Sequence, residues 1–584
     1  MLMMLLFAVV AMDTGRLVYA KSELRKIADM AALDAASRTY TCNGELETST
    51  ADVAARATAA ARAQSFQGEP FSGDLAAAPN AVRVGRVQTN ADFLRQFTPT
   101  APADADAVQV VAAATVPGSL LLRGAEGLGS DVTLSAEAVA HRPSSATLSV
   151  GSYLASLDST QSALLNAVLG GLLGGGLALD ALHYEALASV DLSLLDLIGA
   201  MADVGTVEEL LSADVGIENL LNVTATALDG SQTLDAAVQA LNLLGIAARV
   251  GNLPSIRLGD ILNVAPGADN AALNANLNVL DLVTAAIMLA NQDHLVDVPG
   301  IGVNLGPLAQ VDLRLHVVEP PQIGIGPPGQ NSDGEWRAEA HSAQIQIELV
   351  ARALELNLLG LIRTRVELAL FVQAAPSYAR VETVQCGGKL GPSHIASVRA
   401  YPGLARVGIG TFGDITNPEY DPADIIPSTP VSLKLNLPLV GEVTLAEVSI
   451  AADAQVRNAN PALLDYEAEL FDPESLPQTR TLGSSVGDSV STTLNTLLDS
   501  LVLDVDVLLV GPILDTALGL LGLGSVGELV QALLSPLVNV VLDPLLGALD
   551  TALLNPLLAL LGLNLGGADV SLVALDVGSP QLLK

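Results

Sequence analysis

The chain opens with an apolar run that continues into an amphipathic pattern. Residues 1–12, MLMMLLFAVVAM, carry no charge, but a helix needs roughly 20 such residues to span a bilayer. Beyond them, apolar and small residues recur at spacings of three and four, as on one face of an α-helix. They are Leu17, Ala20, Leu24, Ile27, Ala28, Ala31 and Ala35. The pattern predicts a single helix through residues 1–40, whose first part anchors the chain in a membrane.

Residues 41–150 are expected to form a neck followed by a small β region. An Ala-rich stretch predicts a helix at Ala51–Gln64. Three later segments alternate apolar and polar residues, with turn residues between them, which is typical of half-buried strands. These segments are VRVGRVQT, AVQVVAAATV and SDVTLSAEAVAHR.

The pattern then switches twice. Residues 151–295 are Leu-rich and interrupted by Gly and Asn, which predicts helices such as Asp235–Leu244 and Asn276–Asn291. Residues 296–480 alternate again over long runs and predict an extended antiparallel β region, with one hairpin turning at Leu359–Gly360. The Pro- and Gly-rich stretch Glu319–Trp336 is predicted to be a surface loop that interrupts this sheet.

Residues 481–584 are expected to form short Leu-rich helices and a final strand. A short polar residue before proline is a helix-start signal, and it occurs at Ser535-Pro536, Asp543-Pro544 and Asn555-Pro556. The segments between these starts are too short to cross a bilayer. The predicted fold class is therefore α+β, with an N-terminal membrane helix followed by an elongated ectodomain of antiparallel sheet and short Leu-rich helices.

Composition narrows the possible partners. The formal net charge is −36, which repels phosphate backbones and excludes nucleic acid as a partner. Aromatic residues make up only 3% of the chain. The core must therefore be built from Leu, Val, Ile and Ala.

The N-terminal segment resembles the TadG-like proteins of the Tad (Flp) pilus system. In that family an apolar helix runs into an Asp, a Gly-Arg step, a Leu or Tyr stretch, and an L-x-x-x-A-D-x-A-A-L-x-A-A tail. The matching residues here are Asp13, Gly15, Arg16, Leu17, Tyr19, Leu24, Ala28, Asp29, Ala31, Ala32, Leu33, Ala35 and Ala36. The family usually has a short basic segment and more apolar residues before this point, so we expect the N-terminus to be truncated.

The resemblance implies a role in assembly at the bacterial inner membrane. It predicts a single-pass protein with its bulk in the periplasm, serving as an accessory or minor structural component of a Tad-type pilus or secretion apparatus. Residues 13–36 would contact the membrane and other pilus or secretion components, and Ala31, Ala32, Ala35 and Ala36 would allow close helix approach. The competing interpretation of the N-terminus is a truncated signal peptide cleaved near Ala8 or Ala11.

An alternative from another class is an extracytoplasmic carrier of a lipid or another apolar ligand. In that hypothesis the Leu-rich helices lie against the long sheet and leave a greasy groove with few aromatic side chains.

The two cysteines, Cys42 and Cys386, form no CxxC pair and no Cys/His cluster, which excludes a zinc site of the usual spacing. An even cysteine count in an exported protein favours one disulfide. We therefore predict a bond between Cys42 and Cys386, with two unrelated thiols as the alternative.

Three catalytic or ligand-binding patterns occur, and each has a simpler explanation. Gly483–Gly487 fits the G-x-S-x-G elbow, with Asp488–Leu503 as its following helix, but the last histidine is His394 and the triad lacks a downstream histidine. Gly522–Gly527 fits G-x-G-x-x-G, yet what precedes it is typical of helix and not strand. Asp229–Thr233 loosely resembles a D-x-S-x-S metal loop and equally an ordinary turn. No enzyme activity, cofactor or metal is predicted.

Overall fold

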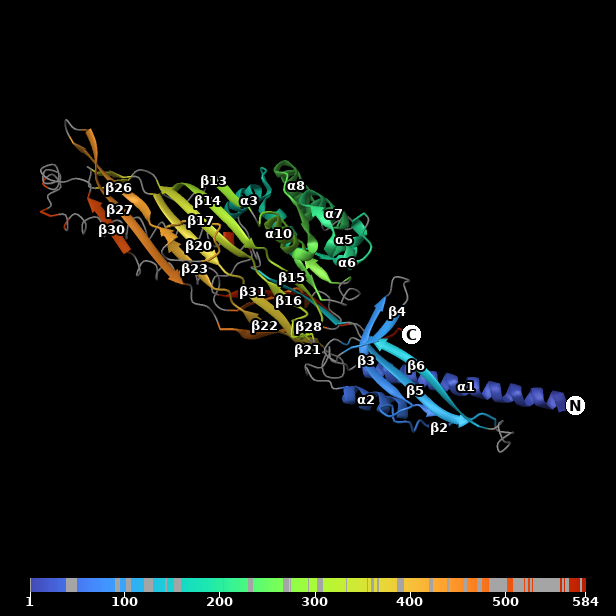
Figure 1. Ribbon diagram of the computed structural model, residues 1–584. Coiled ribbons are helices and arrows are strands. Elements are labelled where there is room, and N and C mark those ends of the chain that lie inside the picture. Colours follow the sequence, from blue (N-terminus) through green and yellow to red (C-terminus); the bar gives the residue numbers. More distant parts are fainter. Residues whose placement is uncertain are drawn as a thin grey trace.

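The computed structural model describes residues 2–482 with gaps, and beyond them residues 502–507, 567–577, 580–583 and a few single positions. The gaps of five residues or more before 482 are 38–49, 90–94, 120–129, 152–158, 229–234, 266–272, 302–307, 386–392 and 470–474. The described parts form an elongated molecule, with the N-terminal helix at one end and a large sheet at the other (Figure 1).

The N-terminal unit is a helix pair packed on a sheet. Helix α1 (Leu2–Ser37) and helix α2 (Thr50–Arg62) share one buried cluster with the sheet β32-β6-β5-β3-β4. Its strands are β3 (Ala81–Thr89), β4 (Arg95–Pro99), β5 (Ala107–Pro117), β6 (Asp131–His141) and β32 (Gln581–Leu582). The predicted helix and all three strands are confirmed, but they build a core with α1 and do not form a neck. Strand β32 pairs with β6, so a segment near the C-terminus of the sequence joins the sheet of the N-terminal unit.

Two sheets form a sandwich next to this unit. One has the order β11-β15-β7-β31-β29 and the other β16-β21-β22-β28, and a single buried cluster lies between them. The first contains β11 (Leu262–Val264), β15 (Ile323–Gly326), β7 (Ser144–Val150), β31 (Ala568–Val577) and β29 (Gln478–Leu482). The second contains β16 (Glu339–His341), β21 (Tyr378–Gln385), β22 (Ser393–Tyr401) and β28 (Ala462–Glu469).

The prediction that Glu319–Trp336 is a surface loop is wrong for its centre. Strand β15 lies inside this segment, all four of its residues are buried, and it pairs with β7 and β11. Gly324 and Gly326 suit the position because a Cβ there would approach the backbone of Glu339 and Arg337 to 2.3 Å. Glycines that suggested a turn are therefore required by close backbone packing.

The largest sheet has ten strands in the order β13-β14-β17-β20-β23-β27-β26-β19-β18, with β30 on β27. They are β13 (Leu295–Ile301), β14 (Leu308–Glu319), β17 (Gln344–Ala353), β20 (Glu367–Ala374), β23 (Ala405–Ile409), β27 (Gly441–Gln455), β26 (Ser428–Leu437), β19 (Ile362–Thr364), β18 (Leu356–Leu358) and β30 (Val502–Val507). The predicted hairpin is confirmed, because β17 pairs antiparallel with β20, and Leu358 of β18 pairs with Ile362 of β19 on the two sides of the predicted turning point.

Helices cover one face of this sheet (Figure 1). They are α3 (Ser159–Leu173), α4 (Ala181–Ser189), α5 (Leu194–Ala200), α6 (Val207–Ser212), α7 (Ile217–Leu228), α8 (Asp235–Gly251) and α10 (Val279–Ala290). Their Leu-rich faces form one buried cluster with alternate residues of the strands, for example Leu313 and Leu315 of β14 and Ile347 and Leu349 of β17. The helices predicted at Asp235–Leu244 and Asn276–Asn291 correspond to α8 and α10 of this layer.

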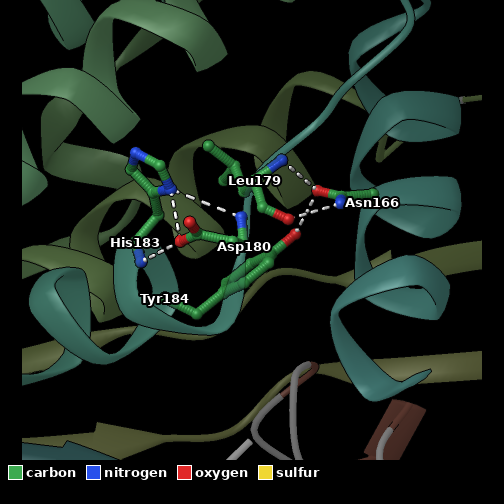
Figure 2. A network of polar contacts seen from close by, with 5 residues as sticks. All are labelled: Asn166, Leu179, Asp180, His183 and Tyr184. Atoms are coloured by element: carbon green, nitrogen blue, oxygen red, sulfur yellow. Dashed lines mark hydrogen bonds and ion pairs between the residues drawn. The ribbon is translucent and has the colours of Figure 1, made fainter. Parts of the chain in front are cut away.

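A polar network joins α3 to α4 (Figure 2). The Asn166 side chain donates to the Leu179 carbonyl oxygen at 2.7 Å and accepts from the Leu179 backbone N–H at 2.9 Å, while the Tyr184 hydroxyl donates to the same amide oxygen at 3.0 Å. Asp180 caps α4 by accepting from the His183 backbone N–H at 3.0 Å. These bonds satisfy the backbone groups where the chain turns between the two helices.

The opposite face of the large sheet carries polar residues beneath the segment that contains β24 (Thr411–Phe412) and β25 (Ile425–Ile426). The Arg314 side chain pairs with Glu348 at 2.6 Å, and Glu348, which is 1% exposed, also accepts from the Phe412 backbone N–H at 2.7 Å. The Gln346 and Gln373 side chains donate to the carbonyl oxygens of Asn417 and Pro418. The sheet is therefore buried on both faces at this point.

The C-terminal region is described only in part. Strand β31 confirms the predicted final strand, but β30 begins at Val502, where the sequence predicted the end of a helix. The three proline-started helices and residues 483–487 lie outside the described residues. At the glycine-rich turn, the Ser525 hydroxyl accepts from the Glu528 backbone N–H at 3.3 Å, which is a helix-capping bond as the turn hypothesis expected.

Candidate functional site

Helix α1 is one continuous helix of 36 residues, as the apolar and amphipathic patterns together predicted. Its C-terminal half is buried in the N-terminal unit. Leu24, Ile27, Ala28, Ala31 and Ala32 each have an exposed fraction of 0%. This half lies against β5, β6 and α2, while the N-terminal end of the helix projects from the molecule (Figure 1).

The alanines of α1 are buried within the N-terminal unit. We expected Ala31, Ala32, Ala35 and Ala36 to let another helix approach closely, but all four are buried in the protein's own core, with 1% exposure or less. They face Ala57 and Ala61 of α2 and alternate residues of the sheet. Small side chains do permit the close approach, and the surface that approaches belongs to the same chain.

Two polar contacts fix α1 near its middle. The Arg16 guanidinium donates to the Pro117 carbonyl oxygen at the end of β5. The Glu23 carboxylate accepts from the backbone N–H of Gln67 at 2.9 Å, in the turn between β1 (Ser65–Phe66) and β2 (Glu69–Pro70). The sheet edge therefore reaches along the helix as far as residue 16.

The predicted site residues fall on different sides of this helix. Leu24, Ala32 and Ala36 are core residues, Gly15 faces open space, and Asp13 and Asp29 are half-buried. Burial raises the pKa of the Asp29 carboxyl, and the nearby Arg25 charge lowers it by less. The predicted residues thus include a structural set and a surface set, which the sequence did not distinguish.

Large apolar side chains are exposed along the N-terminal half of α1. The exposed fractions are 55% for Val10, 69% for Met12, 64% for Val18 and 65% for Tyr19. In the part of the chain that the structure describes, no helix combines the length and hydropathy required for a membrane span. The predicted membrane helix is therefore confirmed as a helix with exposed apolar side chains, while its passage through a membrane is not confirmed.

A pocket of about 240 Å³ lies where α10 meets the sheet β11-β15-β7-β31-β29. Ser149, Thr479 and Ser571 line it from the strands, and Asn278 and Asp281 line it from the start of α10. Burial raises the pKa of Asp281 to about 6, helped by the charge of Asp191, while a hydrogen bond with Ser149 opposes the shift. This carboxylate was missed in the sequence, although Asn278 three residues earlier is a recognisable helix cap.

Several predicted sites lie outside the described residues. These are both cysteines of the predicted disulfide and the Asp229–Thr233 loop. Within the described residues, no group of three or more His, Cys, Asp or Glu side chains is placed to hold a metal ion. The Cys42–Cys386 bond and the metal loop therefore stay untested.

Comparison with known protein families assigns the N-terminal unit. A model described as putative Flp pilus-assembly TadE/G-like matches residues 1–38, and one described as putative Tad-like Flp pilus-assembly matches residues 34–140. A domain of unknown function, DUF8293, matches residues 161–288. No curated protein and no solved structure matches the chain.

The matched ranges follow the structural units. Residues 34–140 comprise the end of α1, α2 and the strands through β6, and residues 161–288 comprise almost all of the helical layer from α3 to α10. The resemblance of the N-terminal segment to TadG-like proteins is thus confirmed, since the first 140 residues of this chain match the two models of Tad-type Flp pilus assembly.

Proposed function

We propose that this protein is a membrane-tethered extracytoplasmic component of a Tad-type pilus or secretion apparatus. The role is mechanical: α1 enters the bilayer with its N-terminal end, and the elongated body projects outward to contact other components. The observation that carries the proposal is the division of α1 into a buried half and an exposed apolar end.

The proposed tether is rigid because the two halves belong to one helix. The buried half is fixed by apolar contacts with α2, β5 and β6, and the Arg16 and Glu23 contacts add polar constraints near the middle. A force on the membrane end is therefore transmitted directly to the sheet of the N-terminal unit. A flexible linker at this point would uncouple the body from the membrane.

Cell fractionation tests the tether. We expect the full-length protein to stay in the membrane pellet after a high-salt wash, and a variant with Leu5→Asp, Leu6→Asp and Val9→Asp to leave it, because charges in the apolar segment oppose insertion. Ala59→Asp, on the exposed face of α2, is the matched control. Recovery of mature wild-type protein without residues 1–12 in the soluble periplasm contradicts the tether and favours the signal-peptide alternative.

No observation favours the alternative of an apolar-ligand carrier. The interface between the helices and the large sheet is filled by a continuous cluster of Leu, Val, Ile and Ala side chains. The pocket at its edge is lined by hydroxyl, amide and carboxyl groups as well as apolar ones. Native mass spectrometry of the ectodomain that detects co-purifying lipid would revive the carrier hypothesis.

A further inference from the structure

One face of α1 changes from apolar to aromatic to basic along its length. Residues seven apart lie nearly one above the other on a helix, since seven residues make about two turns. Three successive pairs on α1 have this spacing, and all are exposed: Ala11 and Met12, Val18 and Tyr19, and Arg25 and Lys26. The last two pairs lie within the part of α1 whose other side is buried in the core.

The basic end of this face contrasts with the rest of the protein. The whole chain has 27 basic and 63 acidic residues, yet residues 16–26 contain four basic residues and one acidic residue. The carboxylate of that acidic residue, Glu23, accepts a hydrogen bond from the Gln67 backbone N–H. Lys21, Arg25 and Lys26 are exposed, so their charges face solvent in a molecule that is otherwise strongly acidic.

The order of side chains corresponds to the order of layers in a bilayer. Met12 and Tyr19 are about 10 Å apart along the axis, and Tyr19 and Lys26 are about 10 Å apart again, at about 1.5 Å per residue. Tyrosine is enriched at the membrane interface, where its apolar ring and polar hydroxyl are both satisfied. Long basic side chains extend along apolar surface to place their charge among headgroups.

We propose that Tyr19 and the basic residues Lys21, Arg25 and Lys26 bind anionic lipid headgroups at the outer surface of the membrane. The inference rests on the proposed function, because it assumes that residues 1–12 enter that membrane. A lipid surface fits this face better than an acidic protein does, because the charges continue an apolar and aromatic stripe that leads into the uncharged N-terminal run. Each basic side chain near an anionic surface adds attraction that salt screens.

Vesicle flotation of the full chain tests the inference. Wild-type protein is expected to bind vesicles of phosphatidylcholine mixed with phosphatidylglycerol more tightly than vesicles of phosphatidylcholine alone. The triple variant Lys21→Gln, Arg25→Gln, Lys26→Gln should lose that preference, with affinity for the mixed vesicles falling on the order of 100-fold. Added salt should also weaken the preference of the wild-type protein for the mixed vesicles, as the triple substitution does.

Two controls separate charge from folding. The variant Arg249→Gln, Arg257→Gln, Arg480→Gln removes the same charge far from α1 and should bind as wild type does. The variant Lys21→Arg, Arg25→Lys, Lys26→Arg keeps the charge and should retain the preference. Because all three positions are exposed, the circular dichroism and melting temperature of the variants should match those of the wild type.

The failures of the two proposals are distinguishable. Equal wild-type binding to neutral and mixed vesicles overturns the headgroup inference and leaves the tether intact. Absence of binding to either vesicle overturns both. Loss of binding in the charge-preserving variant, or loss of the preference in the distant control, also overturns the inference; the first would point to a specific protein contact instead.

Discussion

The N-terminal unit and the body of the protein, which comprises the large sheet and its covering helices, have cores built from different side chains. In the described N-terminal core, twelve of the twenty buried residues are alanine. In the core between the helices and the large sheet, leucine, valine and isoleucine dominate. Alanine lets backbones approach closely but removes little apolar area from water, whereas leucine buries much more area per residue.

This difference predicts which kind of substitution destabilises each region. A leucine core loses stability when a side chain is shortened, because a cavity remains. An alanine core has little to lose by shortening and suffers when a side chain is enlarged, because the neighbouring backbone must move. Under the proposed function, in which α1 transmits force from a membrane, close packing against the sheet would limit movement of the helix more effectively than a thicker layer of flexible side chains.

The largest expected effect concerns the predicted disulfide between Cys42 and Cys386. If Cys42 and Cys386 are bonded, the closed loop exceeds 300 residues, and Cys386→Ser should lower the free energy of unfolding by about 4–5 kcal/mol, less any strain. Non-reducing peptide mapping of periplasm-derived protein is the measurement. Alkylation of both cysteines without prior reduction would end this prediction.

Shortening a core leucine of the body should have the next largest effect. Leu313 on β14 is fully buried between the sheet and the helices. Leu313→Ala should lower the free energy of unfolding by about 3 kcal/mol, since the filled cluster collapses only partly around the cavity. Denaturant unfolding measures the change. Leu195→Ala, at a position 51% exposed, is the control and should change stability by less than about 1 kcal/mol.

Enlarging a core alanine of the N-terminal unit should cause the third largest loss of stability. Ala31→Leu places three extra carbon atoms between α1 and its neighbours, and we expect a loss of about 2 kcal/mol. Hydrogen exchange of the α1 and β5 amides should report it locally. Ala59→Leu, exposed on α2, adds the same atoms without a neighbour to displace. Equal exchange in the two variants would show that the alanine core tolerates added volume.

The smallest expected effect is a pH-dependent change in stability on substitution of Asp281, which lines the pocket at the start of α10. Its folded pKa of about 6 lies above the ordinary value of 3.8, so the folded protein binds the proton more tightly than the unfolded chain. The stabilisation is present below about pH 4 and is lost as pH rises through 6. Asp281→Asn should therefore become more stable than wild type, by on the order of 1–2 kcal/mol at pH 7.

Thermal unfolding at pH 4 and pH 7 measures this difference. Asp180→Asn is the matched control, since the bond from the His183 backbone N–H lowers the pKa of Asp180. Its sign is opposite: any stability that the ionised Asp180 provides is present above about pH 4 and lost below it. An Asp281→Asn difference that does not change with pH would show that this carboxyl titrates normally.

Much of the fold followed from local periodicity. Alternation located β3, β5 and β6, and the long alternating run on both sides of Leu359–Gly360 predicted the hairpin of β17 and β20. The amphipathic spacing in residues 17–35 predicted both the length of α1 and its buried face. These properties depend on the direction in which neighbouring side chains point, and the sequence specifies that directly.

The candidate site was only half predictable. The motif residues of α1 were recognised together, but Leu24 and Ala32 belong to the core while Gly15 and Tyr19 are exposed. Which role each has depends on where β5, β6 and α2 cover the helix, and those contacts join residues far apart in the chain. The same reason explains the error at β15, where glycines suggested a turn and strand pairing with β7 required them instead.

The sequence by itself determined the helix that leads out of the apolar run, the order of helical and alternating regions, the acidic character and the likeness to Tad-type pilus-assembly segments. Only the tertiary structure decided that the alanines of α1 are covered by the chain's own sheet, that β32 returns to β6, and that Asp281 lies in a polar pocket. Periodicity depends on residues that are neighbours in the sequence, whereas burial depends on contacts between residues that are far apart in the sequence.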